Sequence, residues 1–245
     1  MHRTVVPFPE PARVPPGLSI IAFGDVHGHL DLMEEILTKA QMRAATMPER
    51  RHVVISLGDL VDRGPDSAGV VERLMGGVPG CDLVVLRGNH ETLMLEFLAG
   101  SSAATSWLSW GGLETLQSYG VDTAGLSVTG GDVEVLRRRF RARVPQSHVA
   151  FLKSRPLSAT FGDYFFVHAG ARPGIPLDEQ EEQDLIWIRE EMHVSPYRFE
   201  KRIVHGHTPV AAPRIGRTQI NLDTGACYGG TLTAMLFEDA RVRMF

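Results

Sequence analysis

One short stretch of this chain, HVVISLGDLVDRGPD at residues 52–66, limits its fold more than any other. The β-branched and aliphatic residues at its start suit a strand that is covered on both faces. The strand runs into a loop in which glycines flank Asp59, Asp62 and Arg63. Glycine allows the backbone to turn sharply, so these charged side chains can gather where the strand ends. We therefore expect this loop to belong to a functional site.

Two further loops repeat the pattern of an apolar run followed by polar residues and glycine. Residues 18–23 (LSIIAF) lead into GDVHGHLD, and residues 83–86 (LVVL) lead into RGNHE. Asp25, Asp59 and Asn89 follow one another at intervals of roughly 30 residues, the length of a strand, a crossover helix and the next strand. Right-handed crossovers place all three loops at the carboxyl edge of one parallel sheet. We expect the three loops to form one site.

The remainder of the chain predicts an α/β fold with two sets of strands. The 245 residues suit a single catalytic domain over residues 18–245, preceded by an extended, proline-rich arm over residues 1–17. Residues 92–155 have mostly helical patterns interrupted by glycine, and we interpret them as a helical insertion or cap. A second set of strands is predicted at residues 157–161, 164–167, 202–204, 219–222 and 232–237.

Charge and composition argue against several classes of protein. A net charge of −4 disfavours broad nucleic-acid binding. The longest apolar runs are far shorter than the ~20 residues that span a bilayer, so no membrane segment is expected. The only cysteines, Cys81 and Cys227, are too few for a disulfide framework and predict a cytoplasmic location. The oligomeric state is not predicted.

The loops at the predicted strand ends offer oxygen and imidazole donors without a thiolate. Such a mixture fits two divalent metal ions, which we expect to be manganese, with iron, zinc or nickel as alternatives. A carboxylate on the central loop, Asp59, can bridge ions roughly 3.5 to 4 Å apart, and such a pair activates water for attack on a phosphate ester. The predicted metal ligands are Asp25, His27, Asp59, Asn89, His168 and His207.

The same loops offer groups for proton transfer and phosphate binding. His90, next to Asn89, can protonate the leaving group as a general acid, and Asp62 can accept its other ring N–H. Arg63 suits bidentate contact with phosphate. Asn89 and Arg189, the latter in DLIWIRE, are further candidates for phosphate binding.

Five motifs resemble the metallophosphoesterase signature: GDVHG (24–28), GDLVDRG (58–64), GNHE (88–91), VHAG (167–170) and HGHTP (205–209). In order and in detail they are similar to the phosphoprotein phosphatase family, and especially to its bacterial-type serine/threonine members. This resemblance implies a calcineurin-like β-sandwich flanked by helices, in four layers α/β/β/α. It also implies that one metal is held by Asp25, His27 and Asp59, and the second by Asp59, Asn89, His168 and His207.

The resemblance leads us to expect a serine/threonine protein phosphatase. Its substrate would be a phosphoprotein or phosphopeptide, hydrolysed by direct attack of metal-activated water. The alternative is a diadenosine tetraphosphate hydrolase, because bacterial enzymes of that kind share the core and its loops. A non-catalytic metal-binding module is a third interpretation, disfavoured because His90, Asp62 and every candidate ligand are present.

A few other residues near these motifs have open or structural interpretations. Trp107 and Trp110 are spaced to pack a helix of the insertion onto the sheet, and contact with the substrate is the alternative. Asp223 could orient a metal ligand or satisfy a turn. The resemblance leaves open whether Tyr228 reaches the cleft.

Overall fold

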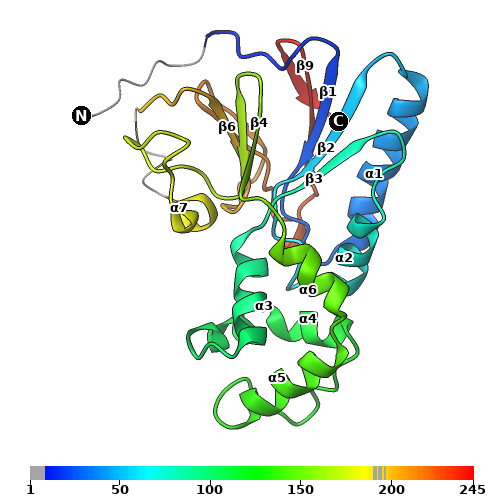
Figure 1. Cartoon of the computed structure of the whole chain (residues 1–245), viewed down its shortest axis with the longest axis vertical. Helices are drawn as coiled ribbons and strands as arrows, with labels where there is room; N and C mark the ends of the chain where they lie inside the picture. The colour runs from blue at the N-terminus through cyan, green and yellow to red at the C-terminus, as the bar shows by residue number, and fades with distance from the viewer. Residues whose placement is uncertain (1–8, 190–191, 193–194, 196) are drawn as a thin grey trace.

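Two facing β-sheets form the body of the molecule in a computed structural model that describes residues 9–189, 192, 195 and 197–245 (Figure 1). The first sheet has the strand order β10-β9-β1-β2-β3 and the second the order β4-β5-β6-β8-β7. The first comprises β1 (Leu18–Phe23), β2 (Arg51–Ser56), β3 (Asp82–Val85), β9 (Ala234–Glu238) and β10 (Arg241–Met244). The second comprises β4 (Ser158–Phe161), β5 (Tyr164–Val167), β6 (Arg202–His205), β7 (Arg214–Ile215) and β8 (Gln219–Asn221).

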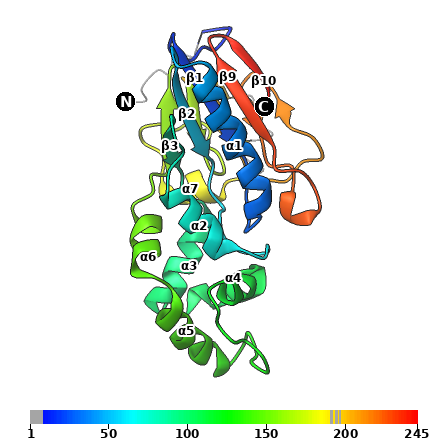
Figure 2. The same cartoon turned by 90° about the vertical axis from the view of Figure 1, so that its right-hand side faces the viewer.

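Helices cover the outer faces of both sheets and gather below them. Figure 2 shows α1 across the outer face of the first sheet, and Figure 1 shows α3 to α6 as a group beneath the two sheets. The helices are α1 (Leu30–Thr46), α2 (Ser67–Met75), α3 (Asn89–Ala99), α4 (Gly112–Ser118), α5 (Asp132–Arg143), α6 (Gln146–Lys153) and α7 (Glu182–Trp187). Two 3₁₀ helices, η1 (Ala103–Trp110) and η2 (Ala226–Tyr228), complete the described elements.

Strand β1 shows how the layers are held together. Ile20 and Ala22 point into the core between the sheets, where Phe166 and Val204 of the second sheet meet them. Ile21 and Phe23 point to the other face, into the core shared with α1 and α2. This alternation is what a strand covered on both faces requires. The outer face of the second sheet packs against α7 in a third apolar cluster, which confirms the predicted α/β/β/α fold class.

Strand direction aligns the loops. β1, β2 and β3 run parallel to one another, as do β5, β6 and β8. The predicted crossover helices are present, and Asp66 caps α2 by accepting the backbone N–H of Gly69 at 2.8 Å. Six loops therefore emerge at the carboxyl ends of parallel strands, where open α/β folds bind ligands.

One predicted strand lies in a different sheet from the one expected. Residues 232–237 correspond to β9, which pairs antiparallel with β1 of the first sheet instead of joining the second set. Strands β7 and β10 were not predicted. No helix of the described residues is long and apolar enough to cross a membrane.

The described part of the N-terminal arm, residues 9–17, contains no helix or strand. Ala12 and Val14 are nevertheless buried in the core between the sheets. The first eight residues of the predicted arm lie outside the described residues. The domain boundaries and the separate role of residues 92–155 stay predictions.

Candidate metal centre and active site

The parallel strands bring the six predicted ligand side chains to one edge of the two sheets. The loops after β1, β2 and β3 enter from the first sheet, and those after β5 and β6 enter from the second. Every one of the six is buried, with at most 4% of its surface exposed. They are Asp25, His27, Asp59, Asn89, His168 and His207.

The backbone of these loops adopts conformations that are costly for residues with a Cβ. Among the described residues, six non-glycine positions have a positive φ, and only Asp239 lies away from the site. The surrounding structure must hold such residues in place, and strain of this kind concentrates at functional loops. The φ values at the site are 44° at His27, 50° at Asp59, 77° at Asp62, 66° at Arg63 and 63° at His207.

Asp59 lies between two groups of imidazoles. Its Oδ2 is 3.6 Å from His27 Nε2 and 3.9 Å from His90 Nε2, whereas its Oδ1 is 3.3 Å from His168 Nε2. Burial works against ionisation of Asp59, but His168 and His90 hold the pKa of its carboxyl well below the usual range. An ionised carboxylate in this position can bridge two cations, one on each side.

On the Oδ1 side of Asp59, acceptor atoms converge on one point. His168 donates its Nδ1–H to the Leu57 carbonyl at 3.0 Å, so in the neutral ring Nε2 has a lone pair directed into the site. That nitrogen faces Asn89 Oδ1 at 2.9 Å and His207 Nδ1 at 3.2 Å. Burial lowers the pKa of His168, but Asp59 outweighs burial and raises it to about 9. The surroundings thus favour a positive charge here, which a divalent cation can supply.

His27 presents a similar lone pair on the Oδ2 side. Its Nδ1–H donates to the Val61 carbonyl at 2.7 Å, so Nε2 faces the site as an acceptor. Burial lowers the pKa of His27 to about 3, and the ring is neutral near pH 7. A neutral imidazole whose second nitrogen is fixed by a carbonyl is the usual form of a metal-ligating histidine.

Asp25 contributes a second buried carboxylate. The backbone N–H of His207 donates to both of its oxygens at 3.1 Å. Glycine is required at residue 206, since a Cβ there would lie 2.1 Å from Asp25 Oδ1. Burial and the neighbouring Asp223 raise the pKa of Asp25 well above its usual value. Asp223 therefore affects the site through its charge, besides accepting the N–H of Gly225.

These donors fit a pair of divalent metal ions. Two triads have ligand atoms within 4.8 Å of one another, one of His27, Asp59 and His90 and one of Asp59, His168 and His207. His207 Nε2 is a further buried nitrogen with no hydrogen-bond partner among the described residues. Mixed oxygen and nitrogen donors without thiolate match the chemistry predicted from the sequence.

His90 and Asp62 form a tightly supported pair. His90 Nδ1 lies 2.5 Å from Asp62 Oδ2, so the ring donates to the carboxylate. Trp107 donates its indole N–H to the same oxygen at 2.6 Å, and Thr115 donates to Oδ1 at 2.6 Å. Burial lowers the pKa of His90, but Asp59 and Asp62 outweigh burial and raise it. The pair can therefore hold a proton next to the metal ligands.

The two predicted arginines lie at different depths. Arg63 donates from Nη1 to His27 Nε2 at 2.5 Å and from Nη2 to His90 Nε2 at 3.0 Å, which places its guanidinium inside the site. Arg189 is exposed and lies at the margin, 3.5 Å from the hydroxyl of Thr208, the neighbour of His207. The phosphate-binding roles of Arg63, Arg189 and Asn89 stay predictions.

Glu91 joins two loops of the site, a role that the sequence interpretation missed. Its carboxylate accepts the backbone N–H groups of Gly88 at 2.8 Å, Asp59 at 3.0 Å and Leu60 at 2.7 Å. Burial and the charge of Asp59 raise its pKa to about 7. A glutamate three residues after Gly88, the residue that precedes α3, fits half of a capping box, and that spacing was the available signal.

Trp107 and Thr115 were also missed as partners of Asp62. Trp107 is fully buried and packs on Phe97 of α3 and Phe140 of α5, whereas its predicted packing onto the sheet stays a prediction. Its hydrogen bond to Asp62 had no local signal. Trp110 is 47% exposed and its ring contacts that of Trp187 of α7, so its predicted packing onto the sheet also stays a prediction.

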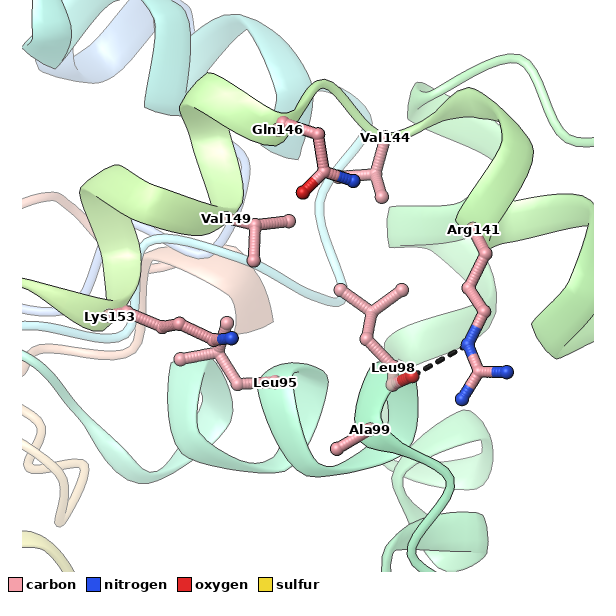
Figure 3. Close-up of a pocket in the computed structure, with 8 residues that line it drawn as sticks. All are labelled: Leu95, Leu98, Ala99, Arg141, Val144, Gln146, Val149 and Lys153. Carbon is pink, nitrogen blue, oxygen red and sulfur yellow. Dashed lines mark hydrogen bonds between the residues drawn. The ribbon is translucent and has the colours of Figure 1, made fainter.

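A cavity of about 270 Å³ lies away from this site, between α3, α5 and α6. Figure 3 shows Leu98, Val144 and Val149 in it, with Arg141 and Lys153 entering from opposite sides. Arg141 donates to the Leu98 carbonyl at 2.7 Å. Its lining includes no carboxylate, imidazole or thiol, so it lacks the chemistry of the strand-end loops.

The chain is similar to known proteins over most of its length. Residues 18–243 match the family described as calcineurin-like phosphoesterase. A bis(5'-nucleosyl)-tetraphosphatase PrpE (asymmetrical) of Oceanobacillus iheyensis is 25% identical over 91% of this chain and 90% of its own. The protein of the same name from Anoxybacillus flavithermus is 29% identical over 75% of this chain and 74% of its own.

Solved structures share the fold. A candidate diadenosine tetraphosphatase superposes with a TM-score of 0.64 at 22% identity, covering 96% of this chain and 97% of that one. A cold-active protein tyrosine phosphatase mutant gives 0.57 at 16% identity, covering 96% and 81%. A serine/threonine phosphatase from Saccharomyces cerevisiae gives 0.56 at 15% identity, covering 94% and 79%.

These relatives correct the expected substrate. The expectation of a serine/threonine protein phosphatase acting on phosphoprotein or phosphopeptide is wrong, because curated relatives over most of the chain are named as dinucleoside tetraphosphatases. The error has a physical reason. The strand-end motifs determine the chemistry at phosphorus, which the two enzyme classes share, whereas the substrate is selected by residues outside the motifs.

Proposed function

Because the chain belongs to the calcineurin-like phosphoesterase family, we propose that it is a metal-dependent hydrolase of bis(5'-nucleosyl)-tetraphosphates. The proposed metal-dependent hydrolysis is supported by the buried acceptor atoms that converge around Asp59. The substrate rests on the relatives of that name, which match about nine tenths of this chain and of their own. The same relatives are named as asymmetrical enzymes, so we propose that cleavage releases a nucleoside monophosphate and a nucleoside triphosphate.

Two divalent cations would be held by the six buried ligands, with Asp59 shared between them. We propose manganese, since carboxylate, amide and imidazole donors suit it. When bound, the cations supply Lewis acidity and a nucleophilic water at neutral pH. We further propose a cytoplasmic location, consistent with the scarcity of cysteine.

Arg63 would bind and orient the polyphosphate. Its guanidinium has five N–H donors and no acceptor. In the structure it donates two hydrogen bonds to imidazole nitrogens. Phosphate oxygens are stronger partners for guanidinium than neutral imidazoles. Binding of substrate would therefore draw Arg63 away from His90 Nε2 and leave that nitrogen free to carry a proton.

His90 would deliver that proton to the leaving phosphate, with Asp62 stabilising the protonated ring. The leaving group of a phosphoanhydride is itself a phosphate and is a weak base. Such a reaction needs less help from an acid than the release of an alkoxide from phosphoserine. The His90–Asp62 pair would thus contribute less to cleavage of a tetraphosphate than to cleavage of an alkyl ester.

Product analysis tests the proposal. The purified protein with Mn²⁺ is incubated with diadenosine tetraphosphate, and the nucleotides are separated by anion-exchange chromatography. We expect AMP and ATP in equal amounts. Two equivalents of ADP would contradict asymmetrical cleavage, and the absence of nucleotide products would contradict the proposed function itself.

A further inference from the structure

Exposed aromatic side chains lie beside the site without a role in the chemistry above. Among the described residues, the large exposed aromatics are Trp110, with 47% of its surface exposed, and Tyr228, with 66%. Tyr228 lies 5.4 Å from the guanidinium carbon of Arg63. Trp110 directly precedes Gly111, whose carbonyl accepts the backbone N–H of Arg63 at 3.2 Å. The ring of Tyr228 and the backbone next to Trp110 are therefore adjacent to the predicted phosphate contact.

Close packing fixes the position of Trp110 relative to Arg63. Gly111 has a φ of 109°, and a Cβ at this residue would lie 2.6 Å from Arg63 Cγ and from Arg63 N. The next residue, Gly112, is in similarly close contact with Trp107, the partner of Asp62. The backbone on the C-terminal side of Trp110 thus has little freedom, and the indole stays at the margin of the site.

A row of rings connects Trp110 to the candidate metal ligands. Its ring centroid is 6.1 Å from that of Trp187, which in turn is 6.1 Å from the ring of His207. The contact between the two tryptophans is T-shaped, with an interplanar angle of 70°. With this contact in place, 47% of the surface of Trp110 is still exposed and available to a ligand.

We propose that Trp110 is a stacking platform for a nucleoside base of the substrate. This inference rests on the proposed function, since only a nucleotide substrate has a base to stack. A base is separated from its nearest phosphate by a single ribose. Its platform should therefore lie beside the phosphate contact, as Trp110 lies beside Arg63. Stacking on indole is tolerant of base identity, because every base has a π-face.

Tyr228 is less suited to this role. The Arg63 guanidinium already lies within cation–π distance of its ring, and the charge of Arg63 is needed for phosphate. The indole of Trp110 has no such cationic partner among the described contacts. Trp110 is therefore assigned as a specificity-determining residue that contacts the base and takes no part in bond breaking.

The inference is tested with Trp110→Ala and, as the conservative variant, Trp110→Phe. Steady-state kinetics are measured with Mn²⁺ on diadenosine tetraphosphate and on p-nitrophenyl phosphate, which has no base. For Trp110→Ala we expect kcat/KM to fall about tenfold more on the dinucleotide than on the aryl phosphate, with the loss in KM. Trp110→Phe keeps an aromatic face and should recover most of that loss.

A binding measurement supplies a readout independent of turnover. A non-hydrolysable methylene analogue of diadenosine tetraphosphate is titrated by calorimetry, and its Kd should rise about tenfold in Trp110→Ala. Equal kinetic losses on both substrates, or an unchanged Kd, would overturn the role of Trp110 while leaving the proposed function intact. Failure of the wild-type protein to hydrolyse any dinucleoside polyphosphate would overturn both.

Discussion

The two carboxylate oxygens of Asp59 face different imidazoles, and the backbone must be strained to allow this. Asp59 has a φ of 50°, and its neighbour across the site, Gly88, leaves no room for a side chain. A Cβ on Gly88 would lie 2.2 Å from Asp59 Oδ1. Glu91 holds the same loop through its backbone N–H groups. The free energy cost of the loop conformation is thus offset by buried hydrogen bonds at the site.

The role of His90 as proton donor can be tested by replacing its side chain. In His90→Asn, kcat should fall by roughly 10²- to 10⁴-fold for substrates with strongly basic leaving groups. The loss should be much smaller for p-nitrophenyl phosphate and for diadenosine tetraphosphate, because their leaving groups need little protonation. The measurement is kcat across a series of aryl phosphates of rising leaving-group pKa. A parallel loss across the whole series would rule out His90 as the proton donor.

The sequence was sufficient to predict which candidate ligand side chains converge at the strand ends, but not all of the residues that support them. Asp25, Asp59 and His168 stand directly after apolar runs, so local pattern and topology bring them together. Trp107 and Thr115 contact Asp62 from 45 and 53 residues away. No periodicity connects those positions, and their contacts are decided only when the helical segment folds back over the loop.

At the level of elements, the parallel pairing of β1, β2 and β3 was predictable, whereas the partner of β9 and the presence of β10 were not. The run that becomes β9 is recognisably apolar, yet nothing within it indicates that it pairs with β1. β10 has the sequence RVRM, whose arginines conceal the strand pattern. Edge strands often carry such charges, because they discourage pairing with other molecules.

An ion pair between α1 and β9 makes stability depend on pH. Arg43 donates to Glu238, and both side chains are mostly buried, at 17% and 15% exposed. Burial alone would raise the pKa of Glu238, but the hydrogen bonds from Arg43 and Ser19, together with the charges of Arg43 and Arg50, outweigh burial and lower the pKa below its ordinary value of 4.5. The stabilisation is therefore present above about pH 4.5 and is lost as the pH falls through the lowered pKa.

Glu238→Gln should lower the free energy of unfolding at pH 7 by about 0.5–1 kcal/mol. The difference from wild type should shrink towards zero as the pH falls through the lowered pKa of Glu238, because the wild-type carboxyl then becomes protonated. Urea denaturation at several pH values measures this difference in the free energy of unfolding. The control is Glu35→Gln, a substitution at an exposed glutamate of α1. A loss that is independent of pH would show that the charge of Glu238 is not responsible.

At the level of the whole molecule, both sheets contribute ligands, so metal binding should stabilise the entire fold. Ions that bind only the folded state at 100 times their Kd stabilise it by about 2.7 kcal/mol, which corresponds to a rise in Tm of roughly 5–10 °C for a chain of this size. We expect this rise when Mn²⁺ is added after chelation. The Asp59→Asn variant lacks the negative charge that both triads share, so Mn²⁺ should raise its Tm only slightly. Equal responses of the two proteins would contradict a shared ligand at Asp59.

The central claim is that this phosphoesterase acts on a dinucleoside polyphosphate and not on a phosphoprotein. The most direct test is to measure kcat/KM for diadenosine tetraphosphate and for a phosphoserine peptide with one preparation of the protein in Mn²⁺. We predict that the value for the dinucleotide exceeds that for the peptide by at least about 100-fold, the discrimination expected when nucleoside contacts are lost. An equal or higher value for the phosphopeptide would contradict the account.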